Sequence, residues 1–264
     1  MQDFMFHRPQ NLKDALAAKK KGSEVKYLAG GQSLIPVMKL GLSSASDLVT
    51  LSGLAELKGI RLEGRELVVG AGVIHDEVAE SAEVKRAIPA LADLASHIGD
   101  PQVRNRGTLG GSLAHNDPAA DYPAAVLALA ATVQTDRRRI AADSYFRGLF
   151  ATALEPDEII VAVRFPLPEK AAYAKFPHPA SLFALVGVFV AKGPSGVRVA
   201  VTGAGPGVFR STELERALSG RFAPEALANV SVPAQGLTND PFGSAEYRAH
   251  LVGVLARRAV AACR

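Results

Sequence analysis

Two glycine pairs constrain this chain more than any other feature of its sequence. The first pair belongs to a segment made of Ala29, Gly30, Gly31, Gln32 and Ser33, and the second to a segment made of Thr108, Leu109, Gly110, Gly111 and Ser112. Because glycine has no Cβ, paired glycines let backbone N–H groups converge on an anion, and the neighbouring hydroxyl groups add donors. Each segment alone is equally explained as a tight turn that packs backbone on backbone. Together they match the two linked phosphoryl groups of a diphosphate, so the sequence predicts a site for a diphosphate-containing cofactor.

Several other kinds of site are disfavoured by what the sequence lacks. It contains no G-x-G-x-x-G opening a helix, no G-x-x-x-x-G-K followed by Ser or Thr, and no G-x-S-x-G, which argues against a Rossmann site, a P-loop and an α/β-hydrolase. The single cysteine, Cys263, excludes a disulfide, an iron–sulfur cluster and a cysteine zinc site within this chain. The six histidines never occur at H-x-H or H-x-x-x-H spacing, so no metal site is predicted. The chemistry is therefore expected to come from a bound cofactor.

Charge and hydropathy bear on partners and location. Lys and Arg number 30 against 26 Asp and Glu, and with 6% aromatics and no tryptophan the chain offers no stacking platform for nucleic acid. The basic runs 19–21 and 137–139 are interpreted as solvated faces. The N-terminus lacks the pattern of a secretory signal, and the longest apolar run, 182–191, is half of the roughly 20 residues that span a bilayer. We expect a soluble, cytoplasmic protein with no transmembrane segment.

The pattern of apolar residues predicts an α+β chain with a large N-terminal and a small C-terminal region. Helices are expected at 11–21, 77–87, 89–97, 122–131 and 245–262, and strands at 25–28, 47–51, 60–62, 67–69, 132–135, 158–165, 171–176, 182–191 and 197–202. Asn11, Asp121 and Ser244 are the expected N-caps of three of these helices. Residues 107–121 have no regular period and are interpreted as a loop, and 166–170 as the linker between the two regions.

At this point the two glycine segments can be compared with a known family. AGGQSLIPVMKL at 29–40 and DPQVRNRGTLGGSLAHNDPAAD at 100–121 resemble the two flavin loops of the FAD-binding medium subunit of molybdenum hydroxylases, the family of the carbon monoxide dehydrogenase medium subunit and the xanthine dehydrogenase FAD subunit. GSAEYR at 243–248 resembles the C-terminal domain of that family. The similarity covers nearly the whole chain.

The resemblance implies both a fold and a place in a larger assembly. It implies a vanillyl-alcohol-oxidase-type FAD-binding domain at 1–168, built from α+β subdomains at about 1–55 and 56–168, and a small α+β flavoprotein domain at 169–264. It further implies a heterotrimer, assembled as a dimer of heterotrimers, with a large subunit that binds molybdopterin and molybdenum and a small subunit with two 2Fe–2S clusters. Electrons would pass from those clusters through FAD to an external acceptor.

Carried over residue by residue, the resemblance implies that both glycine segments hold the diphosphate and neighbouring parts of FAD. Asp121 is implied to hydrogen-bond the cofactor, with a helix cap as the alternative. Lys175, with Tyr173 nearby, is implied to lie near the flavin, with a solvent-facing side chain as the alternative. The chain departs from the family at 178–184, where HPASLFA replaces an Arg- and Asp-containing run, and at 72–75, where GVIH replaces a Thr-x-x-His-like segment.

Two other functions stay open. A self-contained FAD-dependent oxidoreductase on a related fold would need its own substrate pocket, for which the region after the linker shows no obvious residues. A scaffold that has lost flavin is disfavoured because both glycine pairs are intact. The sequence identifies neither the substrate nor the electron acceptor.

Overall fold

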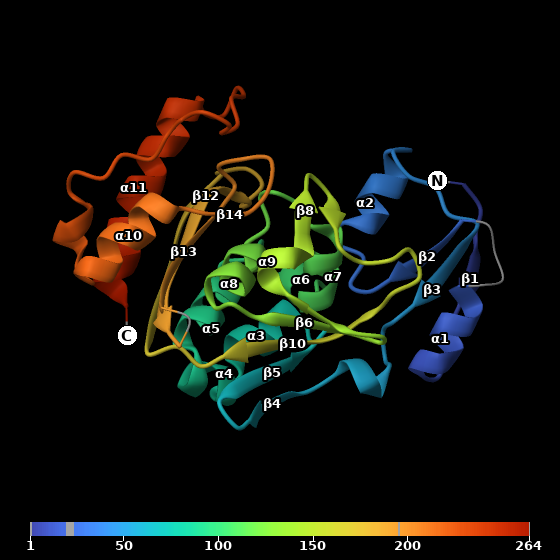
Figure 1. Cartoon of the computed structure of the whole chain (residues 1–264). Coiled ribbons are helices and arrows are strands. Elements are labelled where there is room, and N and C mark those ends of the chain that lie inside the picture. The colour runs from blue at the N-terminus through green and yellow to red at the C-terminus, as the bar shows by residue number, and fades with distance from the viewer. Residues whose placement is uncertain (1, 20–23, 195, 264) are drawn as a thin grey trace.

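The computed structural model describes residues 2–19, 24–194 and 196–263, which form three units in chain order (Figure 1). The first unit is a parallel three-stranded sheet with strand order β1 (Met5–His7), β3 (Asp47–Thr50) and β2 (Val25–Leu28). Helices α1 (Leu12–Lys19) and α2 (Leu34–Lys39) cover its two faces. In β3, Val49 packs in the core that contains Ala15 of α1, and Leu48 packs with Met38 of α2, because successive side chains of a strand point to opposite faces.

The first helix begins as the sequence predicts. Asn11 Oδ1 accepts a hydrogen bond from the Asp14 N–H at 2.9 Å, and its Nδ2 donates to the Asp14 carboxylate at the same distance. The expected stop at Gly22 lies outside the described residues. The chain then enters β2, which ends just before the first glycine segment, so the strand fixes where that segment begins.

The second unit is an antiparallel five-stranded sheet with helices on one face. Its strand order is β4 (Ile60–Glu63), β5 (Glu66–Gly70), β10 (Ile160–Pro166), β6 (Thr132–Thr135) and β7 (Arg139–Ala141). The predicted hairpin is confirmed, with Leu62 opposite Leu67 across the β4–β5 pair. Apolar side chains of β5 and β10, such as Leu67 and Phe165, share a core with Leu91 and Leu94 of the helical layer.

The helical layer contains two short helices, at 101–104 and 142–145, that the sequence does not predict, and it differs from the explicit predictions in three further places. Its helices are α3 (His75–Glu80), α4 (Ala82–Ala87), α5 (Pro89–Ser96), α6 (Pro101–Arg104), α7 (Leu109–His115), α8 (Tyr122–Ala128) and α9 (Ala142–Tyr145), with a short turn η1 (Ala55–Leu57) and a small hairpin of β8 (Phe146–Gly148) and β9 (Ala151–Thr152). The single helix expected at 77–87 breaks at Ser81, whose hydroxyl accepts from the Val84 N–H and begins a new helix. The expected helix 122–131 ends at Ala128, and Ala130 has a φ of 51°.

The third correction concerns the second glycine segment. Residues 109–115 form α7 rather than a loop, with Thr108 as its N-cap. Two adjacent glycines lower helix propensity, which is why the local pattern predicts a loop. Tertiary packing overrides this, because Gly110 lies so close to β5's extension that a Cβ there would come within 2.6 Å of the Ala71 Cβ. Glycine is thus required for the helix to pack at this place.

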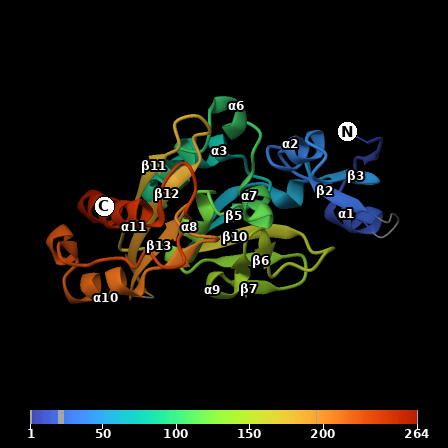
Figure 2. The ribbon, with the colours of Figure 1, turned by 90° about the horizontal axis from the view of Figure 1, so that it is seen from above.

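The third unit is a four-stranded antiparallel sheet with helices on its outer face (Figure 2). It consists of β11 (Lys170–Pro177), β12 (Ala184–Gly193), β13 (Gly196–Thr202) and β14 (Phe209–Arg210), followed by α10 (Thr212–Gly220), η2 (Pro224–Leu227) and α11 (Ala245–Ala262). Ser244 caps α11 as predicted, by accepting from the Tyr247 N–H. Val188 faces the core under α11, whereas Phe189 packs into the core of the second unit. The sheet therefore lies between α11 and the rest of the chain.

The α+β fold predicted from the sequence is confirmed. At the predicted linker, 166–170, only residues 167–169 lie between β10 and β11. On the predicted apolar face of α11, the side chains of Leu251, Leu255 and Ala259 are buried. Tyr247, expected on the same face, is 42% exposed and instead meets the ring of Phe176 edge-on.

Candidate functional site: a cavity between the three units

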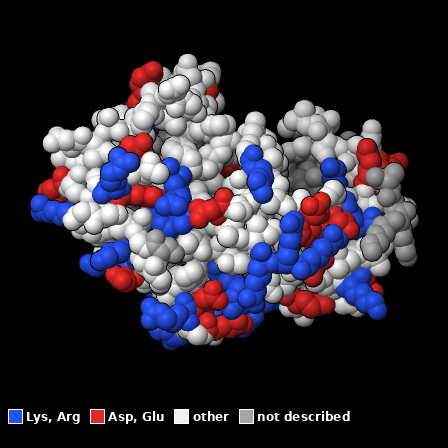
Figure 3. Space-filling model, viewed as in Figure 1, with Lys and Arg blue, Asp and Glu red and all other residues white. Residues whose placement is uncertain are grey.

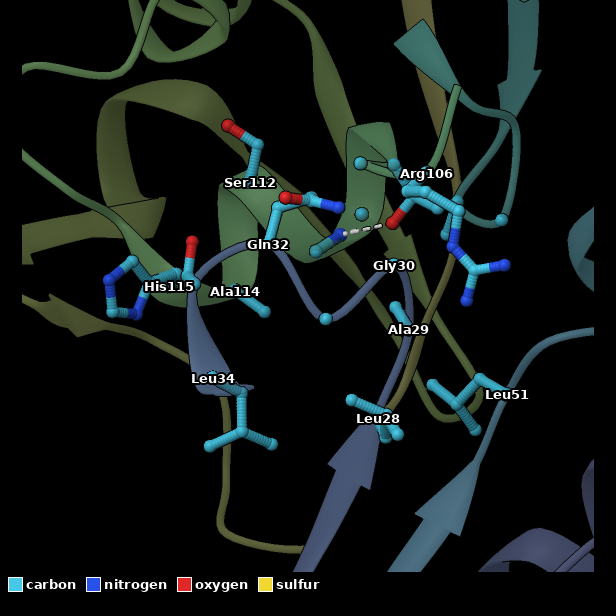
Figure 4. A pocket seen from close by; sticks show the side chains of 18 of the residues that line it. Leu28, Ala29, Gly30, Gln32, Leu34, Leu51, Arg106, Ser112, Ala114 and His115 are labelled. Carbon is cyan, nitrogen blue, oxygen red and sulfur yellow. Dashed lines mark hydrogen bonds between the residues drawn. The ribbon is translucent and has the colours of Figure 1, made fainter. Parts of the chain in front are cut away.

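A cavity of about 660 Å³ lies where the three units meet. Its walls come from the first glycine segment and the end of β2, from α3, α7 and the segment before α8, and from residues 181–183. Figure 4 shows the first glycine segment, with Gly30 and Gln32, facing Ser112 and His115 of α7. The volume falls within the range of about 300–1,000 Å³ that is usual for small-molecule and cofactor pockets.

The first glycine segment presents backbone donors to this cavity. Gly31 has a φ of 76°, a left-handed conformation that glycine adopts without strain. Within the described residues, the N–H groups of 30–33 donate no hydrogen bond to the protein. All five residues from Ala29 to Ser33 line the cavity. A run of free N–H groups next to a cavity is a suitable binding site for an anion.

The second glycine segment contributes in a different way from that expected. Four of its N–H groups are already used: Leu109 donates to Val73 O, Gly110 to Ala71 O, Gly111 to Thr108 Oγ1 and Ser112 to Thr108 O. Of this segment, Thr108, Gly110, Gly111 and Ser112 line the cavity, and Leu109 is fully buried in the core and does not. The segment therefore offers the Thr108 and Ser112 hydroxyls and a glycine surface without Cβ atoms, rather than a cluster of free N–H groups.

The first segment packs closely against the second segment and the two residues before it. A Cβ on Gly30 would collide with the carbonyl group of Arg106, and a Cβ on Gly111 would lie 2.8 Å from Thr108 Oγ1 and 3.5 Å from the Ala29 Cβ. The sequence left a tight turn and an anion site as alternatives for each segment. The structure shows that close backbone packing and proximity to the cavity occur together, because the packing is what brings the segments to the same wall.

Asp121 is buried at the beginning of α8, but it does not cap that helix. Its Oδ1 accepts from the Tyr173 hydroxyl at 2.6 Å and from Lys175 Nζ at 2.9 Å, and its Oδ2 lies 3.0 Å from the same Nζ. Burial raises the pKa of the Asp121 carboxyl, and the Lys175 ammonium and the Tyr173 hydroxyl act in the opposite direction. The helix-cap alternative is therefore wrong, and Asp121 lines the cavity.

The Lys175 side chain is buried, where its ammonium group pairs with the Asp121 carboxylate. This side chain is only 5% exposed, so the solvent-facing alternative is wrong, and it also donates to the His97 carbonyl at 2.9 Å. It does not line the cavity, and it reaches the site only through Asp121.

Sequence reasoning missed His75, which begins α3 behind the second glycine segment. Its side chain lines the cavity and lies against Gly107, where a Cβ would collide with the imidazole Nε2. Burial, with a smaller contribution from Arg104, lowers the pKa of His75 to about 4, so the ring is neutral at neutral pH. Its Nδ1 and the Tyr122 hydroxyl are the two buried side-chain atoms that find no hydrogen-bond partner in the described structure. The one signal in the sequence is that His75 belongs to GVIH at 72–75, the segment in which the chain departs from the family pattern.

Two of the three basic residues at 137–139 form ion pairs. Arg137 contacts Asp157 at 2.5 Å and Arg138 contacts Glu158 at 2.8 Å, so the basic run at 137–139 is paired with acids at its first two positions. On the face shown in Figure 3, acidic side chains lie among the basic ones. Within the part of the chain that the structure describes, no helix is long and apolar enough to cross a membrane.

The fold and the cavity are those of a cofactor-binding protein, and comparison with known proteins identifies its family as one of oxidoreductase subunits. Residues 2–168 match the family model described as the FAD-binding domain in molybdopterin dehydrogenase, and residues 171–263 match the CO dehydrogenase flavoprotein C-terminal domain. The chain belongs to this family of FAD-binding medium subunits of molybdenum hydroxylases.

Individual relatives agree over the full length. The carbon monoxide dehydrogenase medium chain of Hydrogenophaga pseudoflava is 34% identical, over 97% of this chain and 96% of that protein. The nicotine 6-hydroxylase medium subunit of Paenarthrobacter nicotinovorans is 36% identical, over 96% of this chain and 94% of that subunit. A solved carbon monoxide dehydrogenase from H. pseudoflava that lacks the Mo-pyranopterin moiety of its cofactor superimposes with a TM-score of 0.89, covering 99% of this chain and 97% of that one at 35% identity. The predicted family, fold and FAD-binding domain are thereby confirmed.

Proposed function

We propose that this chain is the FAD-carrying electron-transfer subunit of a cytoplasmic heterotrimeric molybdenum hydroxylase. In that assembly it would join a large molybdenum-binding subunit and a small subunit with two 2Fe–2S clusters, as a dimer of heterotrimers. Its membership of the medium-subunit family and the medium-chain names of its relatives support this role. Bound FAD would supply the capacity to take electrons one at a time and to release two of them to an external acceptor.

The residues of the cavity fit this cofactor. The observation that carries the proposal is the run of N–H groups at 30–33, which donate no hydrogen bond within the described residues and which belong to residues that line the same cavity as Ser112. These groups can hold a diphosphate without any cation, because each N–H donates to a phosphate oxygen. Thr108 and Ser112 would donate from the opposite wall, and Asp121 would accept from a donor of the cofactor.

We further propose the domain division that the sequence predicts, at 1–168 and 169–264. Two observations support it: the two family models meet between residues 168 and 171, and α10, α11 and one face of the β11–β14 sheet form a hydrophobic core of their own. The substrate is not assigned, since relatives with the same fold carry names as different as carbon monoxide dehydrogenase and nicotine 6-hydroxylase.

The test is the visible absorption spectrum of this chain purified with its native partners. We expect flavin bands, broad iron–sulfur absorption and two co-purifying chains. In the same complex, Gly31→Val should weaken the flavin bands and leave the iron–sulfur absorption unchanged, because the clusters belong to another chain. Flavin without any partner would replace the proposal with a self-contained flavoenzyme, and a colourless chain would replace it with a scaffold.

A further inference from the structure

The carbonyl groups of 118–120, in the segment 118–121 between α7 and α8, are bound by the C-terminal sheet and the residue that follows β13. The three carbonyl groups each accept a hydrogen bond: Thr202 Oγ1 lies 2.9 Å from Pro118 O and 2.6 Å from Ala120 O, the Gly203 N–H donates to Pro118 O at 2.7 Å, and the Ala184 N–H donates to Ala119 O at 3.3 Å. These donors are far along the chain from the segment that they hold. The position of 118–121 therefore depends on the C-terminal sheet.

The same sheet holds the Asp121 side chain. Tyr173 and Lys175 are two residues apart in β11, so their side chains project from the same face of the sheet, which is the face that packs on the second unit. Thr202 projects from this face of β13, as does Ala200 two residues earlier, which packs in the core of the second unit. The three side chains thus form one group on one face of the sheet.

A glycine in the middle of β12 makes room for this group. A Cβ on Gly187 would collide with the Tyr173 hydroxyl and would lie 2.9 Å from Thr202 Cγ2. Glycine is unfavourable inside a strand, and such a residue often marks a close approach of other atoms. Here the approaching atoms are those that hold Asp121 and the 118–121 backbone.

Asp117, Ala120 and Asp121 line the cavity, whereas Tyr173, Lys175 and Thr202 do not. We propose that Thr202, Tyr173 and Lys175 are positioning residues that hold the 118–121 segment as a wall of the cofactor cavity. The C-terminal sheet then completes a site that the first two units form only in part. This inference rests on the proposed binding of FAD in the cavity.

The hydroxyl of Thr202 is the sharpest point at which to test this role. It has one proton to share between two carbonyl groups, and its side chain is fully buried. Thr202→Val keeps the shape and removes the donor, which leaves a buried acceptor unpaired. Thr202→Ser keeps the donor and serves as the rescue variant.

The control is Ser219→Ala. Ser219 Oγ donates to Glu215 O at 2.7 Å within α10, on the opposite side of the C-terminal sheet from the cavity. The Ser219→Ala substitution removes a hydroxyl-to-carbonyl hydrogen bond in the same domain and leaves the contacts of 118–121 unchanged.

FAD is removed from the purified complex and titrated back, with flavin fluorescence and visible circular dichroism as readouts. We expect Thr202→Val to weaken FAD binding about tenfold and to change the circular dichroism of the bound flavin, and Thr202→Ser and Ser219→Ala to behave as the wild type. Tyr173→Phe, which removes the hydroxyl that donates to Asp121, should shift the same two readouts if the valine variant does not fold.

Two results would overturn this inference and leave the proposed function intact. One is wild-type affinity and circular dichroism in both Thr202→Val and Tyr173→Phe. The other is an equal loss in Ser219→Ala, which would reduce the effect to general destabilisation of the domain. A wild-type complex that takes up no FAD would instead overturn the proposed function, and the inference with it.

Discussion

Gly31→Val separates the role of the first glycine segment in binding from its role in folding. Gly31 has a φ of 76°, and valine placed there suffers the strain of a left-handed β-branched residue, about 1–3 kcal/mol. A Cβ would also lie 3.2 Å from Ile35 Cγ1 and 3.5 Å from Leu28 Cδ1. The segment can relieve this strain by leaving its conformation, which turns the free N–H groups at 30–33 away from the cavity.

The magnitude follows from the strain. FAD binding would have to restore the original conformation, so its free energy is reduced by the same 1–3 kcal/mol, which is roughly a 5- to 150-fold loss of affinity. Gly41→Val is a closely matched control in the same unit. Gly41 has a φ of 72°, a Cβ there would meet no described atom within 4 Å, and the residue does not line the cavity.

Both variants are compared by flavin content after purification, by FAD titration and by thermal unfolding without FAD. We expect similar losses of stability from the two substitutions and a loss of FAD affinity from Gly31→Val alone. Full flavin occupancy in Gly31→Val, or an equal loss of affinity in Gly41→Val, would refute the assignment of 30–33 as the anion-binding segment.

Three further outcomes are expected. Gly111→Val should release FAD as well, because its side chain would push Thr108 away from the cap of α7, and its flavin content should fall below that of Gly41→Val. Lys175→Met leaves a buried carboxylate without its cation and should lower the free energy of unfolding by about 3–5 kcal/mol, and adding Asp121→Asn should recover part of it in urea titrations. The pKa of Glu158 is lowered to about 2, chiefly by its hydrogen bond from Arg138, so its contribution to stability is complete above pH 4.5 and is lost as pH falls toward 2. Glu158→Gln should therefore flatten the acid side of the stability profile, and an unchanged acid slope would contradict this.

Local patterns were sufficient for most elements of the fold. The α11 helix has its predicted bounds because Ser244 supplies a cap hydrogen bond and the apolar residues recur at helical spacing. The β4–β5 hairpin and the β12–β13 pair each consist of two strand-like runs joined by a glycine-containing turn, which the sequence displays directly. These elements carry their own start and stop signals, so no knowledge of distant residues is needed to place them.

The elements that sequence reasoning missed depend on contacts with distant parts of the chain. α7 forms despite its two glycines because Gly110 packs closely against Ala71, a residue of another segment. Asp121 has the local signature of an N-cap, yet its carboxylate is bound by Tyr173 and Lys175 from the C-terminal sheet. Nothing within a few residues of Asp121 distinguishes these two outcomes.

Contacts with distant residues also explain why the two glycine segments have different roles at the cavity. Sequence alone presents them as equivalent, since each joins a glycine pair to hydroxyl-bearing residues. In the folded chain the N–H groups of 109–112 donate to Ala71, Val73 and Thr108, and the bonds to Ala71 and Val73 attach the beginning of α7 to the segment that follows β5. The N–H groups of 30–33 make no such bonds to the residues that the structure describes, so they are left for a ligand. A diphosphate held there would rest on free N–H groups on one side and on a rigid, hydroxyl-bearing wall on the other. Substitutions in the first segment should therefore act mainly on FAD affinity, and substitutions in the second should lower affinity and stability together.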